Sequence, residues 1–430
     1  MGGGLMQLVA YGAQDIYLTG QPQITYFKSV YRRHTNFAIE SILQTINGTA
    51  AFGNRISVTI SRNGDLLKNL WVQYNPKEIL SVCSSGNKIG ANVGHSLFQY
   101  VELEIGGQLI DRQYGSWLTI WNYLTEENAT GVQSPVDSSN LATGLADTYG
   151  VEPGSADSAY NMDFYRATRY QHMSFNHRGM NLSDGSFNSG ADLPTEAYVP
   201  MQFWFCKNPG LAVPLIALQY HEVKFNVFFN QFNAISDKTG TTGSLNGVKI
   251  YADYVYLDTT ERRQFAQNAH EYLIDQVQNN LANVGPAIRM TFNHPVKELV
   301  WIKTPRPVDS AGLYAGLSSP AGKLSPGTYK IGLNGTDRFT ERDVRYFTRL
   351  QVYDCHTGYG SVLFPDSVAV YSFALRPEEH QPSGTCNFSR IDTAQLIRSV
   401  AESTESIDIF AVNYNVLRIM SGMGGLAYSN

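Results

Sequence analysis

The chain has 430 residues, of which 16% are charged and 12% aromatic, and its formal net charge is −5 at pH 7. This length exceeds the size at which one hydrophobic core stops growing, so two domains of about 200 residues are expected. The weak acidity excludes a dedicated nucleic-acid-binding protein, and four scattered cysteines without a C-x-x-C pair exclude a zinc or disulfide framework. The abundance of Tyr and Phe favours strands, which predicts an all-β fold.

The first 25 residues are rich in glycine and mixed in character, which predicts an N-terminal arm before the first domain. From residue 39 onward, short β-favouring runs alternate with turn residues. The runs Arg55–Ser61 and Leu66–Tyr74 flank the pair Asn63-Gly64, which is typical of a two-residue type I′ turn. We therefore expect these two runs to form a hairpin.

A strand and a helix are predicted next. Residues 97–105 alternate apolar with acidic side chains, which is the period of a strand with one buried face. Residues 115–124 place Trp117, Trp121 and Leu124 at helical spacing, so a short helix is expected there.

A long loop and the domain boundary follow. Residues 126–196 are rich in Ser, Gly, Asn and Asp with little periodicity, which predicts an exposed surface loop. A Pro-containing segment near residue 214 marks the expected boundary, giving a first domain at 26–214 and a second at 215–430. Strands of the second domain are expected at His221–Phe229, Lys249–Leu257, Glu271–Val277, Ile288–Phe292, Val296–Lys303 and Ile407–Ile419.

Separate segments of the chain repeat in order and spacing. Residues 68–72 (KNLWV) match 297–302 (KELVWI) at an offset of 229, and Gly107 matches Gly335 at an offset of 228. An F-x-x-x-P pattern begins at Phe205 and again at Phe373, an offset of only 168. The first copy therefore carries roughly sixty extra residues before this pattern, and the loop 126–196 accounts for them. The repeat predicts one β architecture built twice, as a sandwich or jelly roll in which paired sheets cover each other's apolar faces.

Glu102 and Glu104 provide the alternative to a structural role. Retaining glycosidases use two carboxyl groups about 5 to 5.5 Å apart beside a sugar cleft, and neighbouring strand positions could supply them. A two-domain carbohydrate-active β-sandwich protein, either a glycosidase or a lectin, is therefore the rival hypothesis. The solvent face of an ordinary alternating strand explains the same pattern, and we favour that explanation.

The histidines show no metal-binding or nucleophilic pattern. His172 and His177 share a loop without cysteine partners, and no H-E-x-x-H motif is present. Gly94-His95-Ser96 begins like a nucleophile elbow, but Phe98 stands where the second glycine is required. We expect a structural histidine at 95, and no metal, cofactor or catalytic residue.

Asn47, Asn128, Asn181, Asn334 and Asn387 each begin an N-x-[ST] sequon. The last four are candidate glycosylation sites, although short sequons often match by accident. Asn334 also begins an Asn-Gly turn, where backbone geometry alone explains the residue.

Long ordered motifs in both halves resemble the major capsid proteins of nucleocytoplasmic large DNA viruses, most closely the algal-virus type. These motifs are Gly3–Asp15, Leu18–Gly20, Tyr31–Ala38, Asn334–Phe339, Tyr371–Gly384, Cys386–Asp392 and Val412–Met420.

The resemblance implies two consecutive eight-stranded jelly rolls with short helices and long surface loops. It also implies a homotrimer that forms a pseudo-hexagonal capsomer, tiling a large icosahedral shell near an internal membrane. The implied partners are neighbouring capsomers and minor capsid proteins, without direct contact to nucleic acid. The implied location is the virion, after synthesis in the host cytoplasm.

Two parts of the chain receive roles through this resemblance. The arm, residues 1–25, would run along the inner face of the shell, and Tyr31, Arg32 and Arg33 would contact neighbouring subunits. The loop 126–196 would crown the outer surface, where members of the family can carry glycans.

Overall fold

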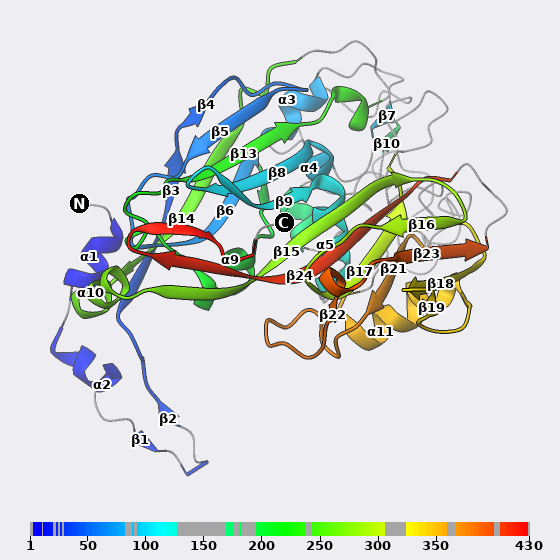
Figure 1. Ribbon diagram of the computed structural model, residues 1–430. Helices are drawn as coiled ribbons and strands as arrows, with labels where there is room; N and C mark the ends of the chain where they lie inside the picture. Colours follow the sequence, from blue (N-terminus) through cyan, green and yellow to red (C-terminus); the bar gives the residue numbers. More distant parts are fainter. Residues whose placement is uncertain are drawn as a thin grey trace.

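The computed structural model describes residues 3–10, 12–19, 23–24, 26–27, 30–81, 88–89, 93–126, 169–174, 180–181, 195–236, 243–305, 324–358, 366–399 and 405–428. Antiparallel strands dominate and form two sandwiches that lie next to each other (Figure 1). None of the described helices combines the length and apolar character needed to span a membrane.

The first sandwich is built from two antiparallel sheets. One has the strand order β11-β6-β14-β3 with β12 beside β6, and the other has the order β4-β5-β13-β8-β9. The strands are β3 (Phe37–Gln44), β4 (Ile46–Asn47), β5 (Arg55–Thr59), β6 (Leu66–Tyr74), β8 (Phe98–Ile105), β9 (Gln108–Tyr114), β11 (Ala197–Pro200), β12 (Val213–Pro214), β13 (Val223–Phe229) and β14 (Lys249–Leu257).

The second sandwich repeats this plan. Its sheets have the orders β15-β24-β17-β21, with β22 beside β17 and β25 beside β24, and β16-β23-β18-β19, with β20 beside β18. The strands are β15 (His270–Asn283), β16 (Ala287–Met290), β17 (Pro295–Lys303), β18 (Thr328–Leu333), β19 (Thr336–Asp337), β20 (Arg342–Asp343), β21 (Val368–Ser372), β22 (Cys386–Asn387), β23 (Ala394–Ser399), β24 (Ile407–Met420) and β25 (Met423–Leu426).

Short helices and minor strands connect these sheets. They are α1 (Gly3–Val9), η1 (Ala13–Asp15), α2 (Ile16–Thr19), β1 (Gln23–Ile24), β2 (Val30–Tyr31), α3 (Pro76–Ser81), β7 (Lys88–Ile89), α4 (Val93–Ser96), α5 (Gly115–Thr125), α8 (Arg169–Ser174), β10 (Met180–Asn181), α9 (Trp204–Lys207), η2 (Pro209–Leu211), η3 (Phe232–Ala234), α10 (Thr259–Gln267), the π-helical turn η5 (Tyr346–Leu350), α11 (Gln351–Cys355) and η6 (Phe388–Arg390).

The predicted repeat is present in the strand order and in the turns. β6 of the first sandwich corresponds to β17 of the second, and the β8–β9 hairpin corresponds to β18–β19. Gly106 and Gly107 have φ of 58° and 81°, and Asn334 and Gly335 have φ of 49° and 78°. Two consecutive residues with positive φ are what a type I′ turn requires, so both hairpins use the same tight turn.

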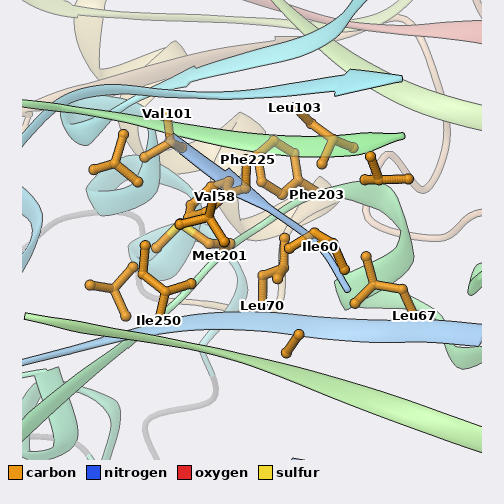
Figure 2. Close-up of a cluster of buried hydrophobic side chains, with 14 of the residues drawn as sticks. Val58, Ile60, Leu67, Leu70, Val101, Leu103, Met201, Phe203, Phe225 and Ile250 are labelled. Carbon is orange, nitrogen blue, oxygen red and sulfur yellow. The ribbon is translucent and has the colours of Figure 1, made fainter. Parts of the chain in front are cut away.

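Alternating side chains fill the space between the sheets of the first sandwich (Figure 2). Val101 and Leu103 of β8 are fully buried and meet Phe225 of β13 and Leu70 of β6 in one cluster. Burying such a side chain contributes roughly 1.5–3 kcal/mol. The predicted one-sided burial of residues 97–105 is therefore confirmed, because the apolar positions of β8 face this core.

The expected hairpin over residues 55–74 is wrong. β5 pairs with β4 and β13, whereas β6 pairs with β14, β11 and β12 in the opposite sheet. Neither Asn63 nor Gly64 has positive φ. A Cβ on Gly64 would lie 2.5 Å from the Cβ of Tyr254, so this glycine provides room for a packed aromatic side chain instead of a tight turn.

Two strands expected in the second domain belong to the first sandwich. β13 pairs with β5 and β8, and β14 pairs with β3 and β6. The Pro-containing segment taken as the boundary is β12, a short strand at the edge of β6, a position that proline tolerates because its missing N–H is not required there. Most of the expected loop 126–196 lies outside the described residues.

Candidate assembly surfaces

α5 joins the two sandwiches. Its apolar residues recur at helical spacing, as expected. Leu118 packs into the core of the first sandwich, but most of the others pack on the second sandwich. Trp117 and Leu124 are fully buried, and Trp121 is nearly so. They face the outer surface of the second sandwich, and the ring centroids of Trp117 and Phe410 are 5.4 Å apart. The strand and helix residues under α5 are Val277, Val300, Ile302, Val352, Val368, Val370, Phe410 and Val412.

Charged groups of the first sandwich border this apolar junction. The ammonium of Lys207, from α9, lies 3.6 Å from the centroid of the Trp121 ring, and burial lowers its pKa to about 8. Burial likewise raises the pKa of Asp111 to about 6, although its carboxylate accepts hydrogen bonds from the Val277 amide (3.1 Å) and from Gln113 (2.9 Å). The junction therefore combines apolar contact with polar links between the sandwiches.

Opposite charges are buried on the second-sandwich side. Lys297 of β17 is completely buried, and its ammonium is 3.0 Å from a carboxylate oxygen of Asp275 on β15 and 4.9 Å from the centre of the Tyr414 ring. An unpaired ammonium at such a site would carry a large desolvation cost. The pair therefore fixes β15 relative to β17 across β24.

His356 lies between two carboxylates at the end of α11. Its Nε2 is 3.0 Å from Glu298, and its Nδ1 is 2.9 Å from Glu378. Burial opposes the charged imidazolium, but the two carboxylates outweigh it and raise the pKa of His356 to about 9. The next residues reach α5, because the Gly358 amide donates to the Leu124 carbonyl at 2.7 Å. The cluster thus holds the segment that caps the end of α5.

Sequence reasoning did not find this cluster. The available signal was the pair Lys297-Glu298, two charges inside an otherwise apolar strand. Such charges need partners, but the partners of Glu298 come from distant segments that no local pattern connects. The described residues contain no cluster of His, Cys, Asp or Glu suited to hold a metal ion.

The N-terminal arm exposes apolar side chains. Its first helix is attached to the body through the Gly4 amide, which donates to Glu40 at 3.0 Å. Arg33 forms an ion pair with Asp15 at 3.4 Å within the arm, Arg32 is exposed, and Tyr31 pairs through its backbone with β1. The exposed apolar residues of the arm are Leu5, Met6, Val9, Ile16, Tyr17, Leu18, Tyr26 and Phe27.

The two carboxylates of the rival enzyme hypothesis are engaged in structural contacts. Glu102 and Glu104 do share the outer face of β8. Glu102 is buried beneath Arg112, whose Nη2 and Nε lie 2.6 and 2.7 Å from it. Glu104 accepts a hydrogen bond from Asn226 at 2.7 Å. Two acids bound by neighbouring side chains stabilise a sheet face. The favoured explanation placed both on a solvent face, which does not hold for Glu102, because Arg112 covers it.

His95 is a buried structural residue. Its two ring nitrogens lie 3.0 Å from the Thr119 hydroxyl and 2.7 Å from the Tyr170 hydroxyl. Burial lowers its pKa to about 3, so the imidazole is neutral. The side chains of His172 and His177 lie outside the described residues.

The sequons differ in their surroundings. Asn334 lies in the β18–β19 turn, where its side-chain oxygen accepts from the Thr393 amide at 3.0 Å. Asn387 caps η6 through the Ser389 amide at 3.1 Å, and Asn47 is exposed on β4. Asn128 and the side chain of Asn181 lie outside the described residues.

Comparisons with known proteins identify the family. A family model described as "Major capsid protein N-terminus" matches residues 25–258, and a model described as "Large eukaryotic DNA virus major capsid protein" matches residues 261–425. The major capsid protein of Pyramimonas orientalis virus is 45% identical over 451 residues, and that of Paramecium bursaria Chlorella virus 1 is 39% identical over 498 residues. Both alignments cover 100% of each chain.

The chain belongs to the major capsid protein family of large eukaryotic DNA viruses. It is therefore a structural protein of the viral capsid, as the sequence motifs predicted. Its similarity to solved structures agrees: a chain of the quasi-atomic model of the PBCV-1 virus capsid gives a TM-score of 0.66 at 34% identity and covers 94% of this chain and 100% of that chain. The Faustovirus major capsid protein, at 14% identity and a TM-score of 0.61, shares the fold. The expected double jelly roll is thus confirmed.

Proposed function

We propose that this major capsid protein assembles as a homotrimer that tiles a large icosahedral shell. The observation that carries the proposal is the duplicated sandwich. Two similar sandwiches per chain, repeated under threefold symmetry, present six similar sides to the neighbouring tiles. A tile with six similar sides packs into a hexagonal array, so the geometry of the chain suits the role.

We further propose the contacts of this tile. Other copies of the trimer and minor capsid proteins adjoin it, and the arm contacts them through Tyr31, Arg32, Arg33 and its exposed apolar side chains. Direct contact with nucleic acid is not part of the proposal, because the net charge is −5. Synthesis in the host cytoplasm and proximity to an internal membrane follow from the family resemblance.

The proposal has no catalytic step. Glycan attachment at Asn128, Asn181, Asn334 or Asn387 remains part of it, through the sequons alone. We also place the division between the two domains after β14, near residue 258, in agreement with the strand pairing and with the limits of the two family models. The first domain then contains β3 to β14, and the second begins at α10.

Size-exclusion chromatography with light scattering tests the trimer. The purified chain is expected to elute with the mass of three copies, and electron microscopy of negatively stained particles should show hexagonal outlines. A chain that remains monomeric at about 100 µM, or a particle with fourfold or fivefold outline, would contradict the proposal. Measuring glycan hydrolysis with the same sample tests the rival hypothesis of a glycosidase.

A further inference from the structure

The helix that joins the sandwiches has a counterpart in the second sandwich. α5 follows β9, whose last residue, Tyr114, pairs with Tyr100 of β8. In the same way η5 follows β20, whose last residue, Asp343, pairs with Thr328 of β18. The pair Tyr114 and Asp343 is separated by the same 229 residues as the strand repeat. The helical segment 346–355, which we call the second helix, therefore corresponds to α5.

The residues of α5 that contact the second sandwich have counterparts on the second helix. At an offset of 229, Trp117 corresponds to Tyr346, Trp121 to Leu350, and Leu124 to Tyr353. These positions keep the spacing i, i+4 and i+7, so they form one face of the helix.

The two helical faces differ in what covers them. In α5 the face is buried against the second sandwich, as described above. In the second helix, Leu350 is 48% exposed and Tyr353 is 84% exposed. Tyr346 is half-buried and packs on the core of its own sandwich, whereas Leu350 and Tyr353 stay open in the described part of the chain. Exposed apolar side chains that lie together often mark a contact surface, so this helix has the residues of a contact.

The surface that would receive this helix is also present, on the first sandwich. Trp71 of β6 lies opposite Tyr251 of β14. In the second sandwich the corresponding pair is Val300 of β17 and Phe410 of β24. Tyr251 therefore has the same position on the first sandwich that Phe410 has on the second, where α5 covers it. The rings of Trp71 and Tyr251 stack at 4.3 Å and are only partly buried.

The edge of the same face is open. Leu43 of β3 lies opposite Tyr251 and is 53% exposed. At the other end of the sheet, α10 covers Val255 with Phe265. The part of this face made of Trp71, Tyr251 and Leu43 is only partly covered by the described part of the chain.

A third correspondence agrees with the first two. Lys207 contacts Trp121 at the junction. The F-x-x-x-P offset of 168 makes Leu375 its counterpart in the second sandwich, and Leu375 is 78% exposed. Trp121 itself corresponds to Leu350. A contacting pair at the internal junction is thus matched by two exposed leucines on the second sandwich.

We propose that the Tyr346, Leu350 and Tyr353 face of one copy packs on the Trp71 and Tyr251 face of the next copy. This contact repeats between chains the packing of α5 within the chain, and it places Tyr346 against Tyr251 as Trp117 lies against Phe410. The occupant of the open sheet face is a second copy of this chain, because the same chain provides the matching helix. The inference rests on the proposed trimer and names its contact surfaces. Because each copy uses a helix on one side and a sheet on the other, the interface is heterologous, and under the threefold symmetry of the proposed trimer it closes as a ring.

Two variants disrupt the two sides separately. The helix variant, Leu350→Glu with Tyr353→Glu, places charges on the exposed helix face and opposite Asp253 of the partner's sheet. The sheet variant, Ser41→Glu with Leu43→Glu, adds bulk and negative charge beside Tyr251, so the two mutated surfaces repel each other. All four side chains are exposed, so each variant should keep the circular dichroism spectrum of the parent and unfold in a cooperative transition. Val284→Glu, at a position 55% exposed on the β15–β16 connection, is the matched control.

Sedimentation at several concentrations measures the association. Each variant is expected to associate at least about 30-fold more weakly than the parent, as for a central interface residue, whereas the control stays trimeric. An equimolar mixture of the two variants should form a two-chain species, because the intact helix face of one variant can pack on the intact sheet face of the other. This species should not add a third chain.

The outcomes separate the two proposals. If both folded variants remain trimeric, or if the mixture of two monomeric variants yields no two-chain species at about 100 µM, the helix-on-sheet contact is overturned while the trimer stands. If the parent chain itself is monomeric, both proposals fail.

Discussion

Several buried charged residues in this capsid protein are paired, and some of the pairs connect segments that are distant in sequence, as Lys303 and Glu405 do. Arg398 and Glu405 are both almost fully buried and lie 3.2 Å apart, with Lys303 at 3.7 Å from the same carboxylate. Such pairs add little net stability compared with apolar side chains, but removing one partner leaves an uncompensated charge and costs about 3–5 kcal/mol. We infer that they fix one arrangement of the strands and exclude others.

Substituting His356→Gln should destabilise the chain near pH 6.5 by a few kcal/mol, on the order of the buried-pair value. The pKa of His356 rises from 6.5 in the unfolded chain to about 9 in the folded chain. Its stabilisation is therefore full below about pH 6.5 and is lost as the pH rises through 9. Urea unfolding of parent and variant at pH 6, 8 and 9.5 should show a difference that shrinks with pH.

The control for this measurement is His34→Gln, at an exposed histidine. Its unfolding midpoint should match that of the parent at each pH. A His356→Gln difference that stays constant across the range, or that grows with pH, would show that the imidazolium does not stabilise the fold.

At the scale of the element, the same turn recurs where the same strands meet. The β8–β9 and β18–β19 hairpins both use two residues with positive φ, and Gly107 and Gly335 occupy the second position of each turn. At both glycines a Cβ would have open space around it, so the backbone conformation alone requires glycine there.

Gly335→Ala should destabilise the chain by roughly 1 kcal/mol, because alanine must then adopt φ near +78°. Gly332→Ala, three residues earlier in β18, is the matched control: its φ is not in the left-handed region and its nearest neighbour atom is at an ordinary 3.6 Å. The control should be neutral or slightly stabilising. Thermal unfolding of the two variants compares them directly, and equal effects would argue against the turn assignment.

At the scale of the whole molecule, α5 makes the two sandwiches one structural unit. Its tryptophans pack on the second sandwich, and the core of the first sandwich also includes Ile274, Leu417 and Ile419 from the long strands β15 and β24. A tile that bears load between neighbours needs such a fixed relation between its halves.

Trp117→Ala should cost about 3–5 kcal/mol, the range for removing a buried aromatic side chain. Because the lost contacts lie between the sandwiches, we expect the single unfolding transition to divide into two in differential scanning calorimetry. Ser116→Ala, at the neighbouring half-buried helix position, should stay within about 0.5 kcal/mol of the parent. An undivided transition in Trp117→Ala would mean that other contacts couple the sandwiches.

Local patterns predicted most elements but not their partners. The alternation in residues 97–105, the helix at 115–124 and the strands that became β14, β17 and β24 were all visible in the sequence, because burial on one face imposes a period. The hairpin at 55–74 and the assignment of β13 and β14 to the second domain were wrong, because which strands pair depends on contacts more than a hundred residues apart. The His356 cluster was missed for the same reason.

The sequence by itself determined that one β architecture occurs twice and that the chain is a capsid protein, because spacing and long motifs survive without coordinates. Only the tertiary structure decided that α5 covers the other sandwich and that the equivalent helix exposes Leu350 and Tyr353. Two similar helical faces have similar patterns in sequence, and only packing in space shows which of them is buried.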